Sequence, residues 1–208
     1  MLRFRCSPYI TYSSAPRRSF GPARYDFLTG FAGAVFQEFK NAMSALRFQE
    51  LAVKRVSPEA AGAVAITFAI PDADKDRFAF EPGQFLTLRA TINGQDVRRS
   101  YSISSPRSRL AKAGELEVGI RPVEGGVFSN WAAQSVRAGD TIQVMPPDGR
   151  FTVKKQRAIH RVGFAAGSGI TPILSIAATT LEEQPGSKFT LIYGNRRMSS
   201  VMFNEALQ

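Results

Sequence analysis

Residues 84–104 read QFLTLRATINGQDVRRSYSIS, and this stretch decides the expected fold of the surrounding chain. Its two arms, Gln84–Ala90 and Gln95–Ser104, are strand-like segments rich in alternating β-branched, aromatic and polar residues. The dipeptide Asn93-Gly94 between them is typical of a tight hairpin, because both residues tolerate the left-handed backbone that such a turn needs. The stretch therefore predicts an antiparallel hairpin and a β-rich fold.

Similar short strands are expected on both sides of this hairpin. They are Glu50–Arg55, Ala63–Ile70, Glu115–Val123 and Thr141–Met145. Turn dipeptides such as Pro82-Gly83 separate the strands. Six strands at this spacing are typical of a small antiparallel barrel, with one helix, Val127–Val136, interrupting it.

The pattern changes after residue 157. It predicts a strand at Arg161–Ala166, a helix at Thr171–Glu183, a strand at Lys188–Tyr193 and a helix at Ser199–Leu207. This β-α-β-α order is the opening half of a doubly wound parallel sheet. Two strands do not complete such a sheet, so we expect the chain to be truncated at its C-terminus. The fold class is thus an antiparallel barrel followed by half of a parallel α/β domain, with boundaries at 1–48, 49–157 and 158–208.

Residues 1–25 contain no acidic side chain and many Arg, Ser, Tyr and Pro residues. This composition resembles an organelle transit peptide, although a disordered basic arm and a true translation start at Met43 both remain open. Farther on, phenylalanines at helical spacing suggest a short amphipathic helix. They are Phe27, Phe31, Phe36 and Phe39. We expect residues 1–42 to be dispensable for folding.

Composition excludes several classes of protein. The chain is 44% hydrophobic and 21% charged, which is typical of a globular protein. The single cysteine, Cys6, excludes an internal disulfide and a four-cysteine metal site, and the single histidine, His160, argues against a multi-histidine metal site. A net charge of +10 suggests anionic partners, but no nucleic-acid-binding motif is present. The uncharged stretch Val162–Leu181 contains Gly and Pro, which favour a strand–loop–helix over a membrane span.

Arg99, Tyr101 and Ser102 lie near the end of the second hairpin strand. Alternation puts Arg99 and Tyr101 on one face. A guanidinium suits a diphosphate, a tyrosine ring can lie against an aromatic ring, and Ser102 offers a hydroxyl or a backbone N–H to a ring nitrogen. A solvated strand with a packed tyrosine explains these residues equally well when they are taken alone.

Two glycine-containing turns precede expected helices. Gly125-Gly126 comes before a helix with Ser129 in its first turn, and Gly167-Ser168-Gly169 links an apolar strand to Thr171-Pro172. The unsatisfied N–H groups of a helix N-terminus favour an anion. Both turns therefore favour phosphate binding, with an ordinary tight turn as the alternative at each.

Asn195 and Arg196 follow the second apolar strand. In a nucleotide-binding domain this position meets the adenosine ribose, where an acidic residue favours NAD and arginines favour the 2′-phosphate of NADP. A surface arginine without a ligand is the alternative, and it carries more weight for Arg197.

Taken together and in this order, these motifs resemble the ferredoxin–NADP reductase-like flavoproteins. The matching motifs are Pro82-Gly83-Gln84-Phe85, Arg99-x-Tyr101-Ser102, Gly126-x-x-Ser129, Pro147-x-Gly149-x-Phe151, Gly167-x-Gly169-x-Thr171-Pro172 and Tyr193-Gly194-Asn195-Arg196. They cover residues 49–208. Within the family, four segments look most like reductase subunits of the phenylacetyl-CoA epoxidase type. They are Ala166–Ile176, Ala178-Thr179-Thr180-Leu181, Phe189–Arg196 and Met202-Phe203.

The resemblance implies a flavin-binding barrel and two cofactors, FAD and NADPH, with NADH less favoured. Tyr101 and Ser102 are the expected catalytic positions, with Tyr101 stacked on the flavin and Ser102 near its N5 atom. The implied FAD-binding residues are Arg99, Tyr101, Ser102, Ile103, Val118, Ile120, Arg121, Gly125, Gly126, Val127, Phe128 and Ser129. The implied nucleotide-binding residues are Gly167, Ser168, Gly169, Thr171, Pro172, Asn195 and Arg196. No metal ligand is expected in the chain.

The implied activity is that of an FAD-dependent NAD(P)H oxidoreductase. Hydride would pass from NADPH to FAD, and single electrons would then pass to an iron–sulfur centre that feeds an oxygenase. The expected partners are an iron–sulfur (ferredoxin) domain, whose [2Fe–2S] cysteines would lie beyond Gln208, and the oxygenase. A non-catalytic FAD-binding module and the reductase of a different oxygenase system remain alternatives. The expected location is the cytoplasm, or an organelle if the basic N-terminal extension is a targeting signal.

Overall fold

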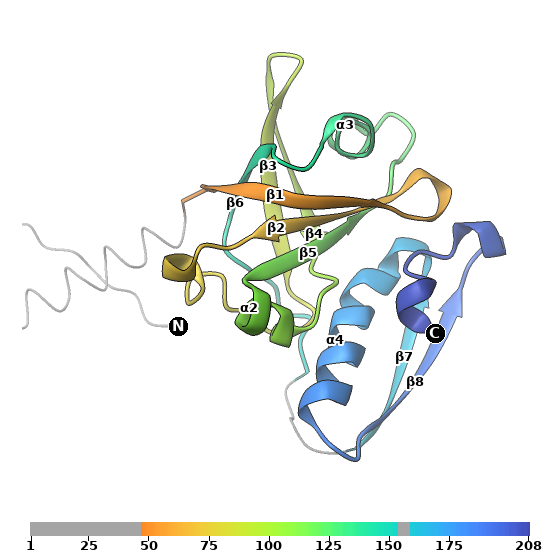
Figure 1. Cartoon of the computed structure of the whole chain (residues 1–208). Coiled ribbons are helices and arrows are strands. Elements are labelled where there is room, and N and C mark those ends of the chain that lie inside the picture. The colour runs from red at the N-terminus through yellow and green to blue at the C-terminus, as the bar shows by residue number, and fades with distance from the viewer. Residues whose placement is uncertain (1–46, 154–158) are drawn as a thin grey trace, which may run out of the picture. The chain divides into compact units, whose positions relative to one another are not determined.

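A computed structural model describes residues 47–153 and 159–208, and these residues belong to one compact unit (Figure 1). The expected N-terminal leader and the phenylalanine-rich helix lie outside the described residues. Within the described ranges, no helix is both long and apolar enough to cross a membrane.

Six strands form one antiparallel sheet, as the sequence predicts. The strands are β1 (Gln49–Pro58), β2 (Val64–Ala69), β3 (Phe85–Ile92), β4 (Gln95–Ser102), β5 (Glu115–Ile120) and β6 (Thr141–Val144). Their order across the sheet is β4-β3-β6-β1-β2-β5. The edge strands β4 and β5 approach each other through an isolated pairing of Ile103 with Val118. The sheet is therefore curled into a half-barrel.

The predicted hairpin joins β3 to β4. Asn93 and Gly94 both have positive φ angles, 50° and 76°, which is the backbone that a two-residue hairpin turn requires. The pairing runs without a bulge from Ile92 opposite Gln95 to Phe85 opposite Ser102. This register fixes which side chains of β4 face the interior of the curled sheet.

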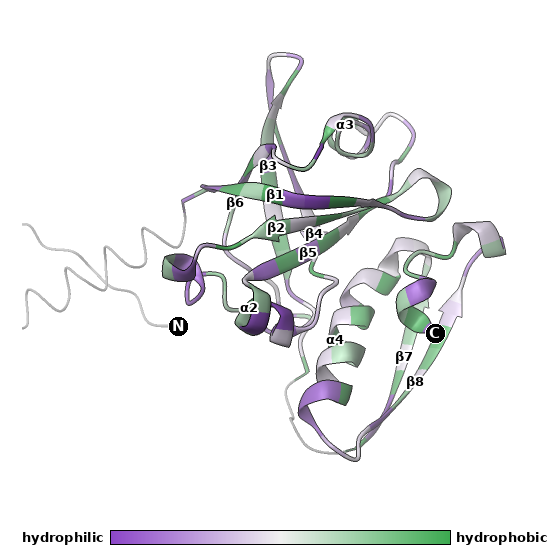
Figure 2. Ribbon diagram, viewed as in Figure 1, coloured by the Kyte–Doolittle hydropathy of each residue, from purple (hydrophilic) through white to green (hydrophobic). Residues whose placement is uncertain are grey.

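The core lies inside the curled sheet. Figure 2 shows hydrophobic residues along β2, whose side chains are buried over nearly its whole length. Leu86 and Leu88 of β3 and Ile66 and Phe68 of β2 are completely buried. Burial of such side chains supplies the main stabilisation of the domain.

Two helices, not the single expected one, interrupt the strands. Helix α3 (Val127–Ser135) confirms the prediction, but α2 (Arg107–Ala113) was not predicted. Pro106 and Gly114 flank α2, and Gly114 ends it in the left-handed conformation, so the stop signal is present. Helix α2 is short and Leu110 is its one buried residue, so it has no periodic apolar face that the sequence could reveal.

The second part of the chain contains β7 (His160–Ala166), α4 (Ile170–Glu183) and β8 (Lys188–Gly194). The two strands are parallel, as predicted, and they pair in register from His160 opposite Lys188 to Ala166 opposite Gly194. Ring atoms of Phe189 and a methyl group of Ile173 approach the backbone at Gly163, so α4 covers one face of the strand pair. Figure 1 shows α4 running beside β7 and β8.

The predicted helix at Ser199–Leu207 is wrong. The structure has two single 3₁₀ turns there, at Met198–Ser200 and Glu205–Leu207, separated by Met202 and Phe203. Phe203 has a φ angle of +57°, which cannot continue a right-handed helix. Both Met202 and Phe203 are buried against Ala63 and Ala65 of the barrel, so tertiary packing overrides the local helical pattern.

Candidate functional site

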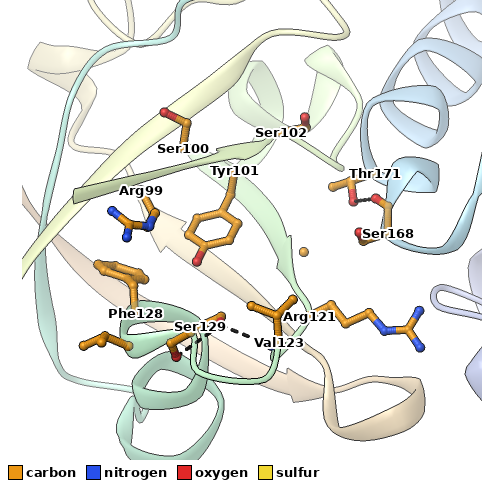
Figure 3. Close-up of a pocket in the computed structure, with 13 residues that line it drawn as sticks. Arg99, Ser100, Tyr101, Ser102, Arg121, Val123, Phe128, Ser129, Ser168 and Thr171 are labelled. Carbon is orange, nitrogen blue, oxygen red and sulfur yellow. Dashed lines mark hydrogen bonds between the residues drawn. The ribbon is translucent and has the colours of Figure 1, made fainter. Parts of the chain in front are cut away.

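A pocket of about 350 Å³ opens where β4, the end of β5, α3 and the start of α4 meet (Figure 3). Its walls carry most of the site residues that the sequence predicts. They are Arg99, Tyr101, Ser102, Arg121, Gly126, Val127, Phe128, Ser129, Ser168 and Thr171, joined by Ser100, Gly119 and Val123. Residues more than 70 positions apart in the sequence thus line one pocket.

Arg99 provides an uncompensated positive charge in this pocket. Its Nη1 atom donates to the Arg98 carbonyl oxygen at 2.6 Å, and among the described residues it forms no ion pair. No acidic residue lines the pocket. The first N–H groups of α3 add a partial positive charge, because a helix N-terminus leaves them without intrahelical partners. This side of the pocket is suited to an anion.

Tyr101 presents its ring to the pocket from the same face of β4 as Arg99 (Figure 3). The ring lies 5.7 Å from the ring of Phe128, which in turn lies 5.2 Å from Trp131 in an edge-to-face arrangement. Burial raises the pKa of Tyr101 to about 12, and the nearby Arg99 only partly offsets this effect. The tyrosine therefore stays a neutral phenol near pH 7 and offers an aromatic face together with a hydroxyl.

Ser102 lines the pocket at the last position of β4. The Ile103 N–H donates to the Gln84 carbonyl oxygen at 3.0 Å. Because ladder bonds alternate along an antiparallel pair, the Ser102 N–H points away from β3. The backbone N–H of Ser102 therefore makes no hydrogen bond to β3 and can donate to a ligand.

The turn before α3 is built around a close contact at Gly126. A Cβ atom at this position would lie 2.4 Å from the Ser129 Oγ atom and 2.6 Å from a methyl group of Val123, so any other residue would displace these side chains. Ser129 Oγ accepts the Val123 N–H at 3.3 Å and faces the pocket (Figure 3). These contacts explain why Gly126 and Ser129 occur together, and they place the serine hydroxyl beside the helix N-terminus.

A second pocket, of about 520 Å³, lies beside the first. It is lined by Arg121, Ala166, Gly167, Gly194, Asn195, Arg196 and Ser200. It contains two arginines and no acidic residue. The side-chain oxygen and nitrogen of Asn195 are both buried and have no hydrogen-bond partner in the described part of the chain. A buried amide without partners is costly. The Nδ2 atom needs an acceptor, such as a phosphate oxygen, and the Oδ1 atom needs a donor, such as a hydroxyl group.

Arg121 lines both pockets. Its Nη1 atom would lie 3.4 Å from a Cβ atom at Gly167, which puts the guanidinium beside the turn that begins α4. Figure 3 shows this side chain extending from the end of β5 toward Ser168. The family resemblance implies a contact of Arg121 with FAD alone, whereas the geometry places its charge between the two pockets.

Six other predicted site residues do not line either pocket with their side chains. Ile103, Val118 and Ile120 are completely buried in the hydrophobic core, so they can offer a ligand only their backbone atoms. Gly125, Gly169 and Pro172 line neither pocket. The predicted set lacks three residues that line the first pocket, Ser100, Gly119 and Val123, and three that line the second, Ala166, Gly194 and Ser200. Successive side chains of a strand point to opposite faces. Gly119 therefore lies on the same face of β5 as Glu117, away from the core, and the sequence could have shown this.

The donor sets of the two pockets fit the groups that the sequence implies. In the first pocket, the unpaired Arg99, the α3 N-terminus and the Tyr101 ring match a diphosphate joined to an aromatic ring system. In the second, Arg121, Arg196 and the unsatisfied Asn195 amide match a phosphorylated nucleoside. The described residues contain no cluster of His, Cys, Asp and Glu that could hold a metal ion.

Comparisons with known families agree with this geometry. Residues 51–153 match the oxidoreductase FAD-binding domain, and residues 164–208 match the oxidoreductase NAD-binding domain. The chain is 48% identical over 162 residues to a component of the 1,2-phenylacetyl-CoA epoxidase of Escherichia coli K12, covering 77% of this chain and 44% of the relative. It is 41% identical over 160 residues to the ferredoxin reductase component of the 3-ketosteroid-9-alpha-monooxygenase of Rhodococcus rhodochrous, covering 76% and 44%. The chain thus spans less than half the length of these relatives.

Solved structures show the same fold. Phthalate dioxygenase reductase, described as a modular structure for electron transfer from pyridine nucleotides to [2Fe–2S], superposes with a TM-score of 0.64 at 24% identity over 77% of this chain and 47% of its own. A ferredoxin–NADP⁺ reductase from Neisseria gonorrhoeae with bound FAD and NADP gives a TM-score of 0.62 at 24% identity over 77% and 63%. The two domain matches together show that this chain belongs to the oxidoreductases with an FAD-binding and an NAD-binding domain, and its curled sheet and parallel strand pair have the fold of the ferredoxin–NADP reductase-like structures.

Proposed function

We propose that this chain is the FAD- and NADPH-binding part of a reductase that supplies electrons to an oxygenase through an iron–sulfur centre. The observation that carries the proposal is the pair of adjoining pockets, both lined by arginines and free of acidic residues, which meet at Arg121. Two relatives are components of an epoxidase and a monooxygenase, which supports the proposal that an oxygenase is the final electron acceptor. The proposed division is an FAD-binding barrel at 49–157 and an NAD(P)-binding part at 158–208.

FAD, when bound, accepts a hydride from a reduced nicotinamide nucleotide and releases electrons one at a time to a metal centre. The protein residues position the reactants. Arg99 and the α3 N-terminus would bind the FAD diphosphate, and the Tyr101 ring would offer the flavin an aromatic face. Ser102 would offer a hydrogen-bond donor, from its hydroxyl or its backbone N–H, to the flavin N5 position. No side chain is required as a general base, which agrees with the absence of an acidic residue from the pocket lining.

In the second pocket the proposed ligand is NADPH. The turn at Gly167–Gly169 and Arg121 receive the diphosphate, while Arg196 receives the 2′-phosphate. NADPH is favoured over NADH because this wall contains two guanidinium groups and no carboxylate to bind a ribose hydroxyl.

FAD binding is the first test. The chain contains one tryptophan, Trp131. Its ring packs directly against the ring of Phe128, which lines the pocket. Bound flavin absorbs where tryptophan emits, so titration with FAD should quench Trp131 fluorescence. A chain that neither quenches nor retains yellow colour after exposure to excess FAD would contradict the proposal.

Nucleotide choice is the second test. Isothermal titration of the FAD-loaded chain with NADP⁺ and NAD⁺ should give tighter binding of NADP⁺. Arg196→Ser should weaken NADP⁺ binding by about 1.5–3 kcal/mol, the contribution of a charged hydrogen bond, and should leave NAD⁺ binding nearly unchanged. Equal losses for both nucleotides would assign Arg196 to the shared part of the nucleotide and would remove the argument for NADPH.

A further inference from the structure

The hydroxyl of Tyr193, near the end of β8, joins two segments that are distant in sequence. It donates to the Gly167 carbonyl oxygen at 2.9 Å and accepts the Met202 N–H at 3.2 Å. The ring is partly buried against the apolar cluster that contains Ile170 and Phe203. Tyr193 thus links the turn before α4 to the segment that follows β8.

The bond to Gly167 controls the direction of a donor in the proposed phosphate turn. A carbonyl and the next N–H belong to one planar peptide unit. Holding the Gly167 carbonyl therefore also orients the Ser168 N–H. Thr171 Oγ1 donates to the Ser168 carbonyl oxygen at 2.7 Å and orients the Gly169 N–H in the same way. The Ile170 N–H also donates to the Gly167 and Ser168 carbonyl oxygens, and the two side-chain hydroxyls add a second constraint on these successive peptide planes.

The other end of this connection reaches the barrel. The Phe203 N–H donates to the Glu59 Oε2 atom at 2.7 Å, and Glu59 follows β1. The Phe203 ring lies so close to Gly119 of β5 that a Cβ atom there would be 2.8 Å from it. Phe203 has a positive φ angle, which is unfavourable for a non-glycine residue. These contacts hold Met202 and Phe203 in place on the barrel.

We propose that Tyr193 is a positioning residue, which holds the phosphate turn in register with the FAD barrel through Met202, Phe203 and Glu59. The proposal rests on the proposed function in one respect: the ligand of the turn is the NADPH diphosphate. Tyr193 contacts neither proposed cofactor, and its role is to fix the peptide plane that presents the Ser168 N–H. Glu59 anchors the other end of the same hydrogen-bonded series.

The test uses Tyr193→Phe, which removes only the hydroxyl. Thr190→Val is the matched control, because the Thr190 hydroxyl also bonds on β8, to the ring of His160 at 2.7 Å, but on the exposed face of the strand. Backbone ¹⁵N order parameters of the nucleotide-free chain give the first readout. In Tyr193→Phe, the values at Ser168 and Gly169 should fall from about 0.85 toward about 0.6, while Thr190→Val should leave them unchanged.

Affinity for NADP⁺ gives the second readout. Loss of one neutral hydrogen bond should raise the Kd of the FAD-loaded chain for NADP⁺ about 3- to 10-fold in Tyr193→Phe, with the Kd for FAD unchanged. Glu59→Ala should lower the order parameter at Ser168, whereas Glu59→Gln, which keeps an oxygen acceptor for the Phe203 N–H, should not.

The outcomes separate the inference from the function on which it rests. Unchanged order parameters at Ser168 in Tyr193→Phe, or equal changes in Thr190→Val, would overturn the positioning role whatever the chain binds. If the wild-type chain binds no NADP⁺, the proposed function fails, and the order parameters alone decide whether Tyr193 holds the turn.

Discussion

At the residue scale, the candidate site depends on positive charges that form no ion pair within residues 47–153 and 159–208. Arg99 shows this most clearly. Its neighbour Arg98 faces the other side of β4 and pairs with Asp96 at 3.0 Å, whereas Arg99 forms no ion pair among the described residues. A cation beside a helix N-terminus adds to the positive potential there, and both favour an anionic ligand.

Arg99→Ala should therefore weaken FAD binding and leave folding nearly unchanged. Loss of a charged hydrogen bond to the diphosphate costs about 1.5–3 kcal/mol, or roughly 10- to 150-fold in Kd. Quenching of Trp131 fluorescence during an FAD titration measures the Kd of each variant for FAD. Arg98→Ala is the control and should keep the wild-type Kd, so equal losses in the two variants would show that general charge attracts FAD.

Tyr101 is expected to act through its ring. Its pKa of about 12 keeps the phenol neutral, so ionisation should play no part in FAD binding between pH 6 and about pH 9. Tyr101→Phe, which keeps the ring, should change the Kd for FAD by less than about threefold, while Tyr101→Ala should weaken binding by about 1 kcal/mol or more. Equal losses in both variants would show that the hydroxyl, not the ring, carries the contact.

At the element scale, an ion-pair network joins β5 to β1 and α2. Glu115 of β5 lies 2.6 Å from the Lys54 ammonium and 2.9 Å from Arg109 of the unpredicted helix α2. The same arginine reaches Glu117 at 3.0 Å. The Glu117 carboxylate also accepts from Ser104, just after the Arg99–Ser102 segment. The network therefore ties β5, which lines the pocket, to the strand that carries Tyr101.

Lys54, and after it Arg109, hold the pKa of Glu115 below its ordinary value of 4.5. Because the folded-state pKa is the lower one, the carboxylate stabilises the fold above the unfolded value, and this stabilisation is lost as the pH falls through the folded value. Glu115→Gln should thus lower the free energy of unfolding at pH 7 by about 1 kcal/mol, because the Lys54 side chain is half exposed and solvent screens the pair.

The difference between the wild type and Glu115→Gln should shrink as the pH falls below the ordinary value of 4.5 and through the lowered pKa of the folded state, because the wild-type carboxyl then becomes protonated. Urea unfolding at several pH values measures the free energy of unfolding of both proteins and hence this difference. Glu50→Gln, at an exposed position of β1, is the control and should change stability by less than about 0.5 kcal/mol. A loss in Glu115→Gln that stays constant down to pH 3 would contradict the ion-pair explanation.

At the scale of the whole molecule, the parallel strand pair has two unlike faces. Helix α4 covers one face. On the other, Phe164 is 70% exposed, Val162 55% and Ile192 51%, and no described element covers them. An apolar patch of this kind favours self-association.

Replacing Phe164 and Ile192 together by Thr should reduce aggregation and the binding of apolar dyes without lowering the thermal midpoint, because Thr suits a strand and little buried area is lost. Phe189→Thr, on the face that α4 covers, should lower stability by about 2 kcal/mol or more. Light scattering and thermal unfolding measure both effects. A large loss of stability in the Phe164/Ile192 variant would show that this face is covered in the intact chain.

The sequence by itself determined the features that depend on local chemistry. The hairpin at Asn93-Gly94, the positions of the eight strands and the helices α3 and α4 all follow from turn residues and from the repeat of apolar positions. The order of the motifs also predicted the family. Arg99 and Tyr101 could be placed together because they lie two residues apart on one strand, where alternation settles the face.

Only the tertiary structure decided the features that depend on contacts between distant segments. Helix α2 has too short an apolar pattern to be seen. Phe203 leaves the helical conformation because Glu59, 144 residues away, holds its N–H and because Gly119 leaves room for its ring. Contacts between distant segments also bring Arg121 to the lining of both pockets and the Tyr193 hydroxyl to the Gly167 carbonyl oxygen. Each depends on which surfaces meet when the barrel and the α/β segment pack together, and no local pattern in the sequence encodes that meeting.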